Sequence, residues 1–437
     1  HVQARGGVGK ARQLGLDRKF RQQRLQRLGP VPPQVPDHGA RDQEGLAHDH
    51  VREGVVVDAL VALGFGVVAP VIPTFAREFG VSALAASSVI SAFAGMRLVS
   101  ATPASWMLGK FGERNVLTSG LLIVSISSAL AGTSQTFIQL LVLRAIGGLG
   151  STMFTVASMA FLLRVVEASK RGRASSAWSG GFLTGALAGP AVGGVFAVWS
   201  LRAPFFVYAC TLLMAAVVSW RSLKHAHIIE DAAASDPDND GSTVTLSEAA
   251  AQPAYRAAVA VNFSTGFVRF GLINAIAPLF VVEALHQNAS LASTGFLISS
   301  LGQAVLLPRA GRWTDDKGRR FVLLLGGVVT IATLITLAVF QAVHMYFIAM
   351  LLLGASGALL SAAPTAVVGD VTRGKPRGPA LATYSMASDF GGIFGPLVAG
   401  YLLDVSGGFS LPLMLAAALM ASVVLLVVRM PETKAAK

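Results

Sequence analysis

The sequence predicts an all-α polytopic membrane protein whose twelve transmembrane helices form two pseudo-symmetric six-helix bundles. Three observations lead to this fold class: an apolar composition, a series of apolar segments of membrane-spanning length, and a duplication at a fixed offset. Of 437 residues, 53% are hydrophobic, 13% are charged and 46 are glycine, which is too apolar for an ordinary soluble protein. The single cysteine, Cys210, lies in an apolar segment, so we expect neither a disulfide framework nor a cysteine metal site.

Twelve apolar segments follow one another from Gly54 onward, and each has about the 20 residues that a helix needs to cross a bilayer. Their predicted limits are 54–75, 85–107, 116–134, 137–163, 174–198, 203–220, 257–282, 291–311, 321–343, 345–368, 379–402 and 409–428. These limits divide the chain into an N-terminal extension (1–53), a first bundle (54–221), a cytoplasmic linker (222–256), a second bundle (257–429) and a cytoplasmic tail (430–437).

The extension at 1–53 differs in composition from the rest of the chain. It holds ten of the 35 Lys and Arg residues, is rich in Gln, Gly and Pro, and lacks apolar periodicity, so we expect it to be disordered. The recorded sequence begins with His, and we hypothesise a misplaced start or an added segment, with the natural chain opening near 51–57. N-terminal sequencing of the natural protein would contradict this if it began before Arg41.

The placement of positive charge orients the predicted helices. If the chain starts inside, the inner loops and the tail from residue 54 onward hold 20 Lys and Arg residues, whereas the outer loops hold two, Arg77 and Arg202. Cytoplasmic loops carry the excess of Lys and Arg in membrane proteins, so we expect both termini in the cytoplasm of a bacterial-type inner membrane. The formal net charge of +12 therefore follows membrane topology and does not indicate nucleic-acid binding.

Two unrelated motifs recur at the same offset. The Gly-Pro pairs at 189–190 and 395–396 lie 206 positions apart, and so do Gly112 and Gly318. The second pair lies in the similar stretches Gly109-Lys-Phe-Gly-Glu-Arg and Asp315-Asp-Lys-Gly-Arg-Arg. Two motifs that share one offset indicate a duplication, which is typical of transporters built from parallel halves.

The predicted helix at 174–198 is the centre of this pattern. Small residues recur at every fourth position, at Ala177, Gly181, Gly185, Gly189 and Gly193. On an α-helix they form a groove along one face, where a neighbouring backbone can approach closely. Pro190 removes one hydrogen bond inside this helix, a defect that membrane helices tolerate when neighbours satisfy the freed carbonyl. We expect this helix to pack tightly and to bend.

These residues resemble the major facilitator superfamily, and within it the twelve-helix drug/proton antiporters, over Gly54 to about Thr433. The stretch 185–194 matches the antiporter signature at every specified position, 140–150 is similar to a signature linked to proton coupling, and 311–320 looks like the cytoplasmic loop signature. The first copy of that loop departs from the pattern, because Ser105 and Gly109 replace the expected Gly and acidic residue. The conformational motifs that the resemblance implies comprise Gly185, Gly189, Pro190, Gly193, Gly194, Gly112, Gly311, Asp315, Gly318, Arg319, Arg320, Gly395 and Pro396.

Ionisable residues inside the predicted spans are functional candidates, because each costs about 2.5 to 3.5 kcal/mol to insert. Asp389 can lose its charge by protonation and is a candidate proton carrier; the alternative is a fixed partner for an arginine. Asp58 is a second coupling candidate, unless it is merely interfacial. The resemblance implies a role in proton coupling for Arg144, with a packing ion pair as the alternative.

A second group of candidates could line a central substrate cavity. Arg97 and Arg269 could bind anionic substrate groups, or they could snorkel or pair with Asp389. The neutral polar candidates are Asn262, Asn274 and Tyr384.

The resemblance implies two bundles that rock about a central cavity, with the substrate near the bilayer midplane. We therefore expect a monomeric antiporter that exports small amphipathic molecules or drugs, driven by the proton gradient and without a cofactor or metal. The alternatives are a dedicated exporter of one metabolite, such as a sugar or an amino acid, and a membrane sensor without turnover. An enzyme is disfavoured because the sequence lacks a nucleotide loop, a nucleophile elbow and a His-Glu-x-x-His motif.

Overall fold

The computed structural model describes residues 38–165, 171–222, 246–372 and 378–433, and side chains within 52–162, 180–221, 246–372 and 380–433. The chain divides into two compact units, His1–Asp49 and His50–Lys437. Most of the predicted disordered extension and of the predicted linker lies outside the described residues. The described residues are helical and contain no strand, as the sequence predicts.

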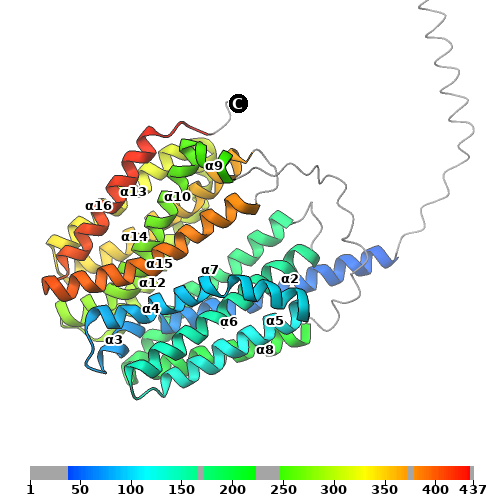
Figure 1. The fold of residues 1–437 in the computed structure, drawn as a ribbon, viewed down its shortest axis with the longest axis horizontal. Helices are drawn as coiled ribbons and strands as arrows, with labels where there is room; N and C mark the ends of the chain where they lie inside the picture. Colours follow the sequence, from blue (N-terminus) through cyan, green and yellow to red (C-terminus); the bar gives the residue numbers. More distant parts are fainter. Residues whose placement is uncertain (1–37, 166–170, 223–245, 373–377, 434–437) are drawn as a thin grey trace, which may run out of the picture. The chain divides into compact units, whose positions relative to one another are not determined.

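The first half of the protein contains seven described helices (Figure 1). They are α2 (His38–Val68), α3 (Ile72–Arg77), α4 (Ala83–Val99), α5 (Ala101–Gly132), α6 (Phe137–Val165), α7 (Arg171–Trp199) and α8 (Ala203–Ser222). Helix α2 begins at His38, so the predicted first limit at Gly54 is wrong, and so is the prediction of disorder for 38–53. The added part includes Ala, Leu, Glu and Gln, which are good helix formers and extend the helix beyond its apolar part.

The second half begins with a short helix and continues with six membrane-spanning segments. Its elements are α9 (Leu246–Ala251), α10 (Pro253–Gly266), η3 (Phe267–Ile276), α11 (Ala277–Leu279), η4 (Phe280–Ala284), α12 (Ala289–Asp316), α13 (Arg319–Val339), α14 (Val343–Val371), α15 (Gly378–Ser406) and α16 (Ser410–Arg429). Ten helices of the described part are long and apolar enough to cross a membrane, when 253–284 counts as one. The first two predicted spans are carried by α2 and by α4 with the start of α5, which gives twelve.

Two predicted spans have irregular backbones. The predicted helix at 85–107 is interrupted at Ser100, between α4 and α5. Pro103, close to the start of α5, cannot donate the hydrogen bond that would continue α4 through this point. The predicted helix at 257–282 changes to wide π-helical turns at Phe267, and Pro278 likewise interrupts the regular hydrogen bonding there.

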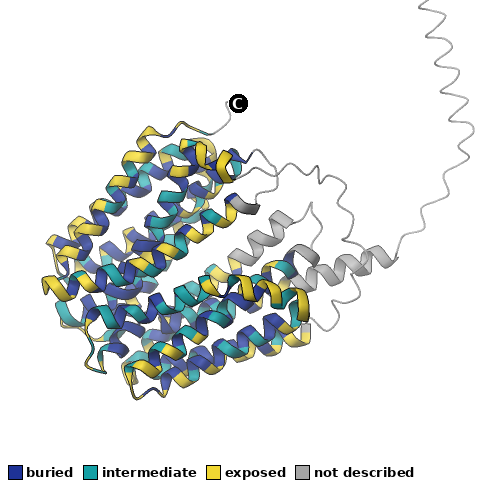
Figure 2. Cartoon of the chain, viewed as in Figure 1, coloured by how far each residue is buried: buried dark blue, intermediate teal, exposed yellow. Residues whose placement is uncertain are grey.

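Burial follows the pattern of helix bundles in a membrane. The buried residues line the contacts between helices, and the outward faces carry exposed residues (Figure 2). Large apolar side chains are prominent among the exposed residues, for example Val328, Ile335, Phe394 and Leu425. A soluble protein would bury such side chains, whereas in a bilayer they contact lipid tails, so this surface supports a membrane-embedded protein.

The two bundles contact each other chiefly through two helix pairs, α4 with α15 and α7 with α12. The carboxylate of Asp404, near the end of α15, accepts hydrogen bonds from the N–H groups of Ala83 (2.8 Å) and Leu84 (2.9 Å) at the start of α4. Further along the same pair, the Ser91 hydroxyl donates to the carbonyl of Ile393 (2.7 Å). These bonds join the first half of α4 to the second half of α15.

An ion pair also connects the two bundles near these ends. The guanidinium of Arg77 on α3 lies 2.7 Å from the carboxylate of Glu283 on η4, and the two residues are 206 positions apart. They are therefore equivalent positions of the duplicated sequence, with opposite charges. At this point of the interface, a residue of the first repeat forms an ion pair with the equivalent residue of the second repeat.

Candidate functional site

The glycine stripe of α7 packs on the backbone of α2. A Cβ added at Gly181 would lie 2.6 Å from the carbonyl oxygen of Val55, and one added at Gly193 would lie 2.5 Å from that of Val67. Gly185 and Gly189, between them, face α2 backbone atoms at similarly close range. The close approach that the stripe predicts is confirmed from Gly181 onward, and Ala177 lies outside the described side chains.

The second half repeats this seam between α15 and the α10–η3 segment. A Cβ added at Gly395 would lie 2.7 Å from the carbonyl oxygen of Phe267, and Gly391 faces the same turn of the helix. Gly271 meets Gly395 in the second half as Gly66 meets Gly189 in the first. Pro190 and Pro396 follow directly within their helices. The duplicated Gly-Pro motif therefore marks the same helix contact in each bundle.

Gly194 belongs to the antiporter-like stretch but faces another direction. A Cβ added there would lie 3.1 Å from the side chain of Ser293 on α12, in the other bundle. Helix α7 therefore contacts its own bundle with one glycine face and the opposite bundle with the next residue. Movement of one bundle against the other therefore changes the contacts of this helix with α12.

Arg144 is buried on α6, with 3% of its surface exposed. Its guanidinium carbon lies 4.8 Å from the centre of the Phe93 ring on α4. Its Nε and Nη1 atoms have no hydrogen-bond partner within the described structure. Arg144 forms no ion pair with a described side chain, so the packing ion pair considered from the sequence is not seen there. An arginine without such a partner inside a membrane helix is costly.

Arg97 lies on α4 and Asp389 lies on α15, two helices that pack against each other at the bundle interface. The Arg97 guanidinium donates to the hydroxyl of Ser151 (3.0 Å). The ion pairs between described side chains join Arg77 to Glu283 and Arg319 to Asp315 and Asp370, so Arg97 and Asp389 do not form one. The structure brings the two charges to one interface without fixing them together.

Asp58 lies on α2 and is 6% exposed. The carboxylate is therefore covered by protein, and its role in coupling stays a prediction. No ion pair to a described side chain compensates its charge. Asp58 and Asp389 are therefore two separate carboxylates, one buried within the first bundle and one partly exposed at the bundle interface.

A polar pocket of about 120 Å³ lies inside the second bundle, between η3, α12, α13 and α14. Two of the predicted cavity residues, Arg269 and Asn274, line it. The other polar lining residues are Thr265, Ser299, Ser300, Gln303, Thr330, Ser356 and Ser361, which sequence reasoning missed. Single Ser and Thr residues occur throughout these helices, so only their position around Arg269 distinguishes them.

Two predicted cavity residues have a structural role. The side-chain amide of Asn262 donates to the carbonyl of Tyr384 (2.6 Å), which joins α10 to α15. The hydroxyl of Tyr384 lies 3.4 Å from that of Thr365 on α14. Neither residue lines the polar pocket, and the prediction that they line a central substrate cavity stays a prediction.

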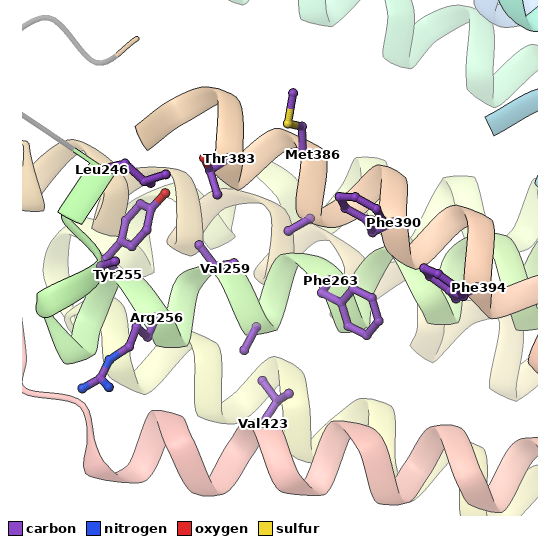
Figure 3. A pocket seen from close by; sticks show the side chains of 13 residues that line it. Leu246, Tyr255, Arg256, Val259, Phe263, Thr383, Met386, Phe390, Phe394 and Val423 are labelled. Atoms are coloured by element: carbon purple, nitrogen blue, oxygen red, sulfur yellow. The ribbon is translucent and has the colours of Figure 1, made fainter. Parts of the chain in front are cut away.

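An apolar groove of about 770 Å³ lies on the other side of α10, among α9, α10, α15 and α16 (Figure 3). Its wall is formed by aliphatic and aromatic side chains, including Phe263, Phe390 and Phe394, with Arg256 at one end. The rings of Phe390 and Phe394 stack with centroids 6.4 Å apart. A volume of this size is within the range of pockets for drug-sized ligands, roughly 300 to 1,000 Å³.

The second copy of the duplicated loop is held by a network of charges. Arg319 donates from its Nε to Asp370 (3.1 Å) and from Nη1 to Asp315 (3.1 Å). The carboxylate of Glu432 accepts from the backbone N–H groups of Arg319 (2.9 Å) and Arg320 (3.1 Å). Gly311 has open space around it, and Gly318 adopts a φ of 99°, which favours glycine. The sequence indicated the loop but not its partners Asp370 and Glu432.

Among the described residues, no group of three or more His, Cys, Asp or Glu residues could hold a metal ion.

A pair of bundles built from one repeated sequence, with few charges inside the membrane-spanning helices, is typical of a membrane transport protein. The family comparison agrees: the chain belongs to the Major Facilitator Superfamily, whose model matches residues 55–255 and 258–437. It is a multi-pass membrane transporter and not an enzyme.

Similar proteins cover most of the chain. Multidrug resistance protein 1 of Bacillus subtilis (strain 168) is 28% identical over 357 residues, which cover 78% of this chain and 87% of that protein. Multidrug resistance protein MdtG of Salmonella choleraesuis (strain SC-B67) is 28% identical over 363 residues, 80% of this chain and 87% of its own. The fold matches the crystal structure of a bacterial homolog to the human lysosomal transporter Spinster, in an inward-facing and occupied conformation, with a TM-score of 0.70 at 14% identity over 87% of this chain and 95% of that one.

Proposed function

We propose that this transporter is a proton-coupled antiporter that exports small amphipathic molecules, drugs among them, by alternating access. The multidrug resistance proteins among its relatives support this substrate class. The large apolar groove also suits molecules with an extended apolar part.

The contacts between the bundles support an inward-facing state. The hydrogen bonds and the ion pair that join described residues of the two bundles lie around 77–91 and 186 in the first bundle and around 283–300 and 393–404 in the second. These are the helix ends that face away from the Lys- and Arg-rich loops. The positive-inside rule predicts that these ends lie on the outer side, which supports a state that is closed outside and loads substrate from the cytoplasm.

The observation that carries the coupling proposal is the pair of membrane-embedded carboxylates, Asp58 and Asp389, without an ion-pair partner among the described side chains. A carboxylate in this environment is less costly when it is protonated, so its charge can change during the cycle. Protonation at the α4–α15 interface would also remove the attraction between Asp389 and Arg97. The two states of the transporter would then differ in stability according to protonation and load, which is what antiport requires.

Replacing either carboxylate tests the proposal. We expect Asp389→Asn to abolish transport driven by a pH gradient while substrate binding remains, and Asp58→Asn to act in the same direction. The measurement uses proteoliposomes with an imposed pH gradient and an internal pH dye, together with equilibrium binding in detergent. Glu78→Gln is the matched control, because Glu78 is an exposed acid at the end of α3. Unchanged proton movement in both Asn variants would exclude these residues as carriers.

A substrate panel separates multidrug export from dedicated export. Lipophilic cations, neutral drugs and sugars are added to the same proteoliposomes. Proton movement with several chemically unlike compounds supports a multidrug antiporter, whereas a response to one compound alone supports a dedicated exporter.

A further inference from the structure

The polar pocket of the second bundle surrounds one charged side chain. Arg269, on η3, is the only ionisable residue among the described residues that line it. It forms no ion pair with a described side chain, although a guanidinium at membrane depth has a high cost when it lacks an anionic partner. Arg269 is exposed and is one of the residues that line the pocket. The charge is therefore available to a ligand.

The wall of the pocket offers further hydrogen-bonding groups. The amide of Gln303 and the hydroxyls of Ser299 and Ser361 line it, and each of these side chains can donate a hydrogen bond. The hydroxyl of Thr265, one turn before Arg269, is buried and has no hydrogen-bond partner within the described structure. The lining side chains thus supply several hydrogen-bond donors beside the Arg269 guanidinium.

The backbone that carries Arg269 is a ten-residue π-helix, Phe267–Ile276. π-Helical turns are rare and frequently occur at functional sites. Here the wider turns place Arg269 and Asn274, five positions apart, on the same pocket. In a regular α-helix, residues with this spacing point in clearly different directions, because each residue turns by about 100°. The irregular backbone thus assembles the site.

The volume of the pocket limits what it can hold. At about 120 Å³, it is smaller than the roughly 300 Å³ at which pockets for drug-sized ligands begin. It fits a compact head group of a few heavy atoms, and the rest of the molecule must lie elsewhere. Ser300, in its wall, donates to the carbonyl of Ala186 on α7 (3.3 Å), so the pocket borders the bundle interface.

We propose that this pocket binds the anionic head group of an amphipathic substrate, with Arg269 as the residue that determines the preference for negative charge. Arginine suits this role because its planar guanidinium donates two parallel hydrogen bonds to a carboxylate, sulfate or phosphate group. The inference rests on the proposed export function and specifies its substrate class as amphipathic anions.

The test compares three amphiphiles with the same tail and different heads: decyl sulfate, decyl glucoside and decyltrimethylammonium. Their binding to the purified full chain is measured by calorimetry. Removing a hydrogen bond to a charged group costs about 1.5 to 3 kcal/mol, so Arg269→Gln should weaken decyl sulfate binding by about tenfold to a hundredfold. Binding of the other two amphiphiles should change little. Arg309→Gln is the matched control, an exposed arginine on α12 that lines neither the polar pocket nor the apolar groove.

Two further variants keep the test decisive. Arg269→Lys retains the charge and loses the two-pronged geometry, so it should lose part of the preference for sulfate, even if the Gln variant fails to fold. Thr265→Val should weaken sulfate binding selectively and by less. The proposal is overturned if the wild type binds the cation as tightly as the sulfate, or if the Arg269 variants weaken all three amphiphiles equally.

The binding and transport measurements together show which of the two proposals is wrong: the anionic head-group pocket or the proton antiport. Sulfate binding that depends on Arg269, without proton movement in proteoliposomes, would support the pocket and overturn the antiport proposal. Proton movement that does not change with Arg269 variants or with the charge of the head group would support the antiport proposal and overturn the head-group pocket.

Discussion

The duplicated loop occurs once in each bundle, and its two copies show what the repeat has retained. Gly112 and Gly318 both adopt a positive φ, 75° and 99°, at equivalent positions. In the first bundle the ammonium of Lys110 lies over Trp106 at 5.0 Å, and in the second that of Lys317 lies over Trp313 at 4.9 Å. The glycine turn is retained at the 206-residue offset, whereas the lysine and tryptophan of the second copy lie one position later, so a similar contact forms beside the turn from different positions of the repeat.

The arginine after each turn is also retained. Arg114 donates to the carbonyl of Trp220 in α8, and Arg320 donates to that of Val428 in α16. Each carbonyl belongs to the final helix of its bundle. Because main-chain carbonyls are present whatever the side chain is, this contact can persist while the surrounding sequence changes.

The charge network differs between the copies. Arg319 binds Asp315 and Asp370 in the second bundle, whereas the positions equivalent to Arg319 and Asp315 are Glu113 and Gly109. A contact between two side chains is lost when either one changes, so such pairs diverge faster than contacts to the backbone. The halves therefore share geometry more than electrostatics.

The largest expected effect concerns the glycine seams, where the two halves agree. Gly189→Ala and Gly395→Ala would each place a Cβ against backbone of the neighbouring helix that cannot move aside. We expect losses of about 3 kcal/mol, at the upper end of the usual cost of overpacking, and of similar size in both bundles. Thermal unfolding in detergent measures this, with Gly180→Ala as the control because no atom lies within 4 Å of a Cβ there. If Gly189→Ala were as stable as the control, the seam would not be a close backbone contact.

A smaller effect is expected where the halves differ. Arg319→Gln removes hydrogen bonds to two carboxylates and should lower the free energy of unfolding by about 1.5 to 3 kcal/mol. Arg114→Gln removes a contact over the Trp220 ring at 3.7 Å and should cost only about 0.5 to 1 kcal/mol. In the same unfolding measurement at high salt, the loss of stability caused by Arg319→Gln should shrink more than the loss caused by Arg114→Gln. Equal effects of the two substitutions would contradict the proposed loss of electrostatics in the first loop.

The smallest effect concerns the ion pair between equivalent positions of the two repeats. Arg77 and Glu283 are about one third exposed, and such ion pairs contribute roughly 0 to 1 kcal/mol. Arg77→Glu should slightly favour separation of the bundles at this end, and the double variant with Glu283→Arg should restore the original behaviour. Distances between spin labels on the two bundles give the populations. Because the two positions are equivalent by sequence, a double variant that did not recover would show that the surroundings of the pair are not symmetric.

Some structural features were predictable because they leave a periodic trace in the sequence. The spans follow from apolar length, the seam follows from glycine spacing, and the relation between the halves follows from the shared offset of Gly112 and Gly318. The break at Ser100 and the π-helix at Phe267 were not predicted, since a single proline inside an apolar segment is compatible with several backbone paths. The sequence also singled out Asp58, Asp389, Arg97, Arg144 and Arg269, because a charge in a span is rare whatever its surroundings.

By itself, then, the sequence determined that this protein is a duplicated twelve-helix membrane protein and identified the few charges inside it. The tertiary structure decided which of the polar and charged candidates pair with other helices and which face a pocket. Asn262 and Tyr384 support helix contacts, whereas Arg269 faces a pocket lined by hydroxyls from three other helices. The reason is physical: insertion into a bilayer depends on the composition of each segment alone, but a binding site depends on which side chains from distant segments meet.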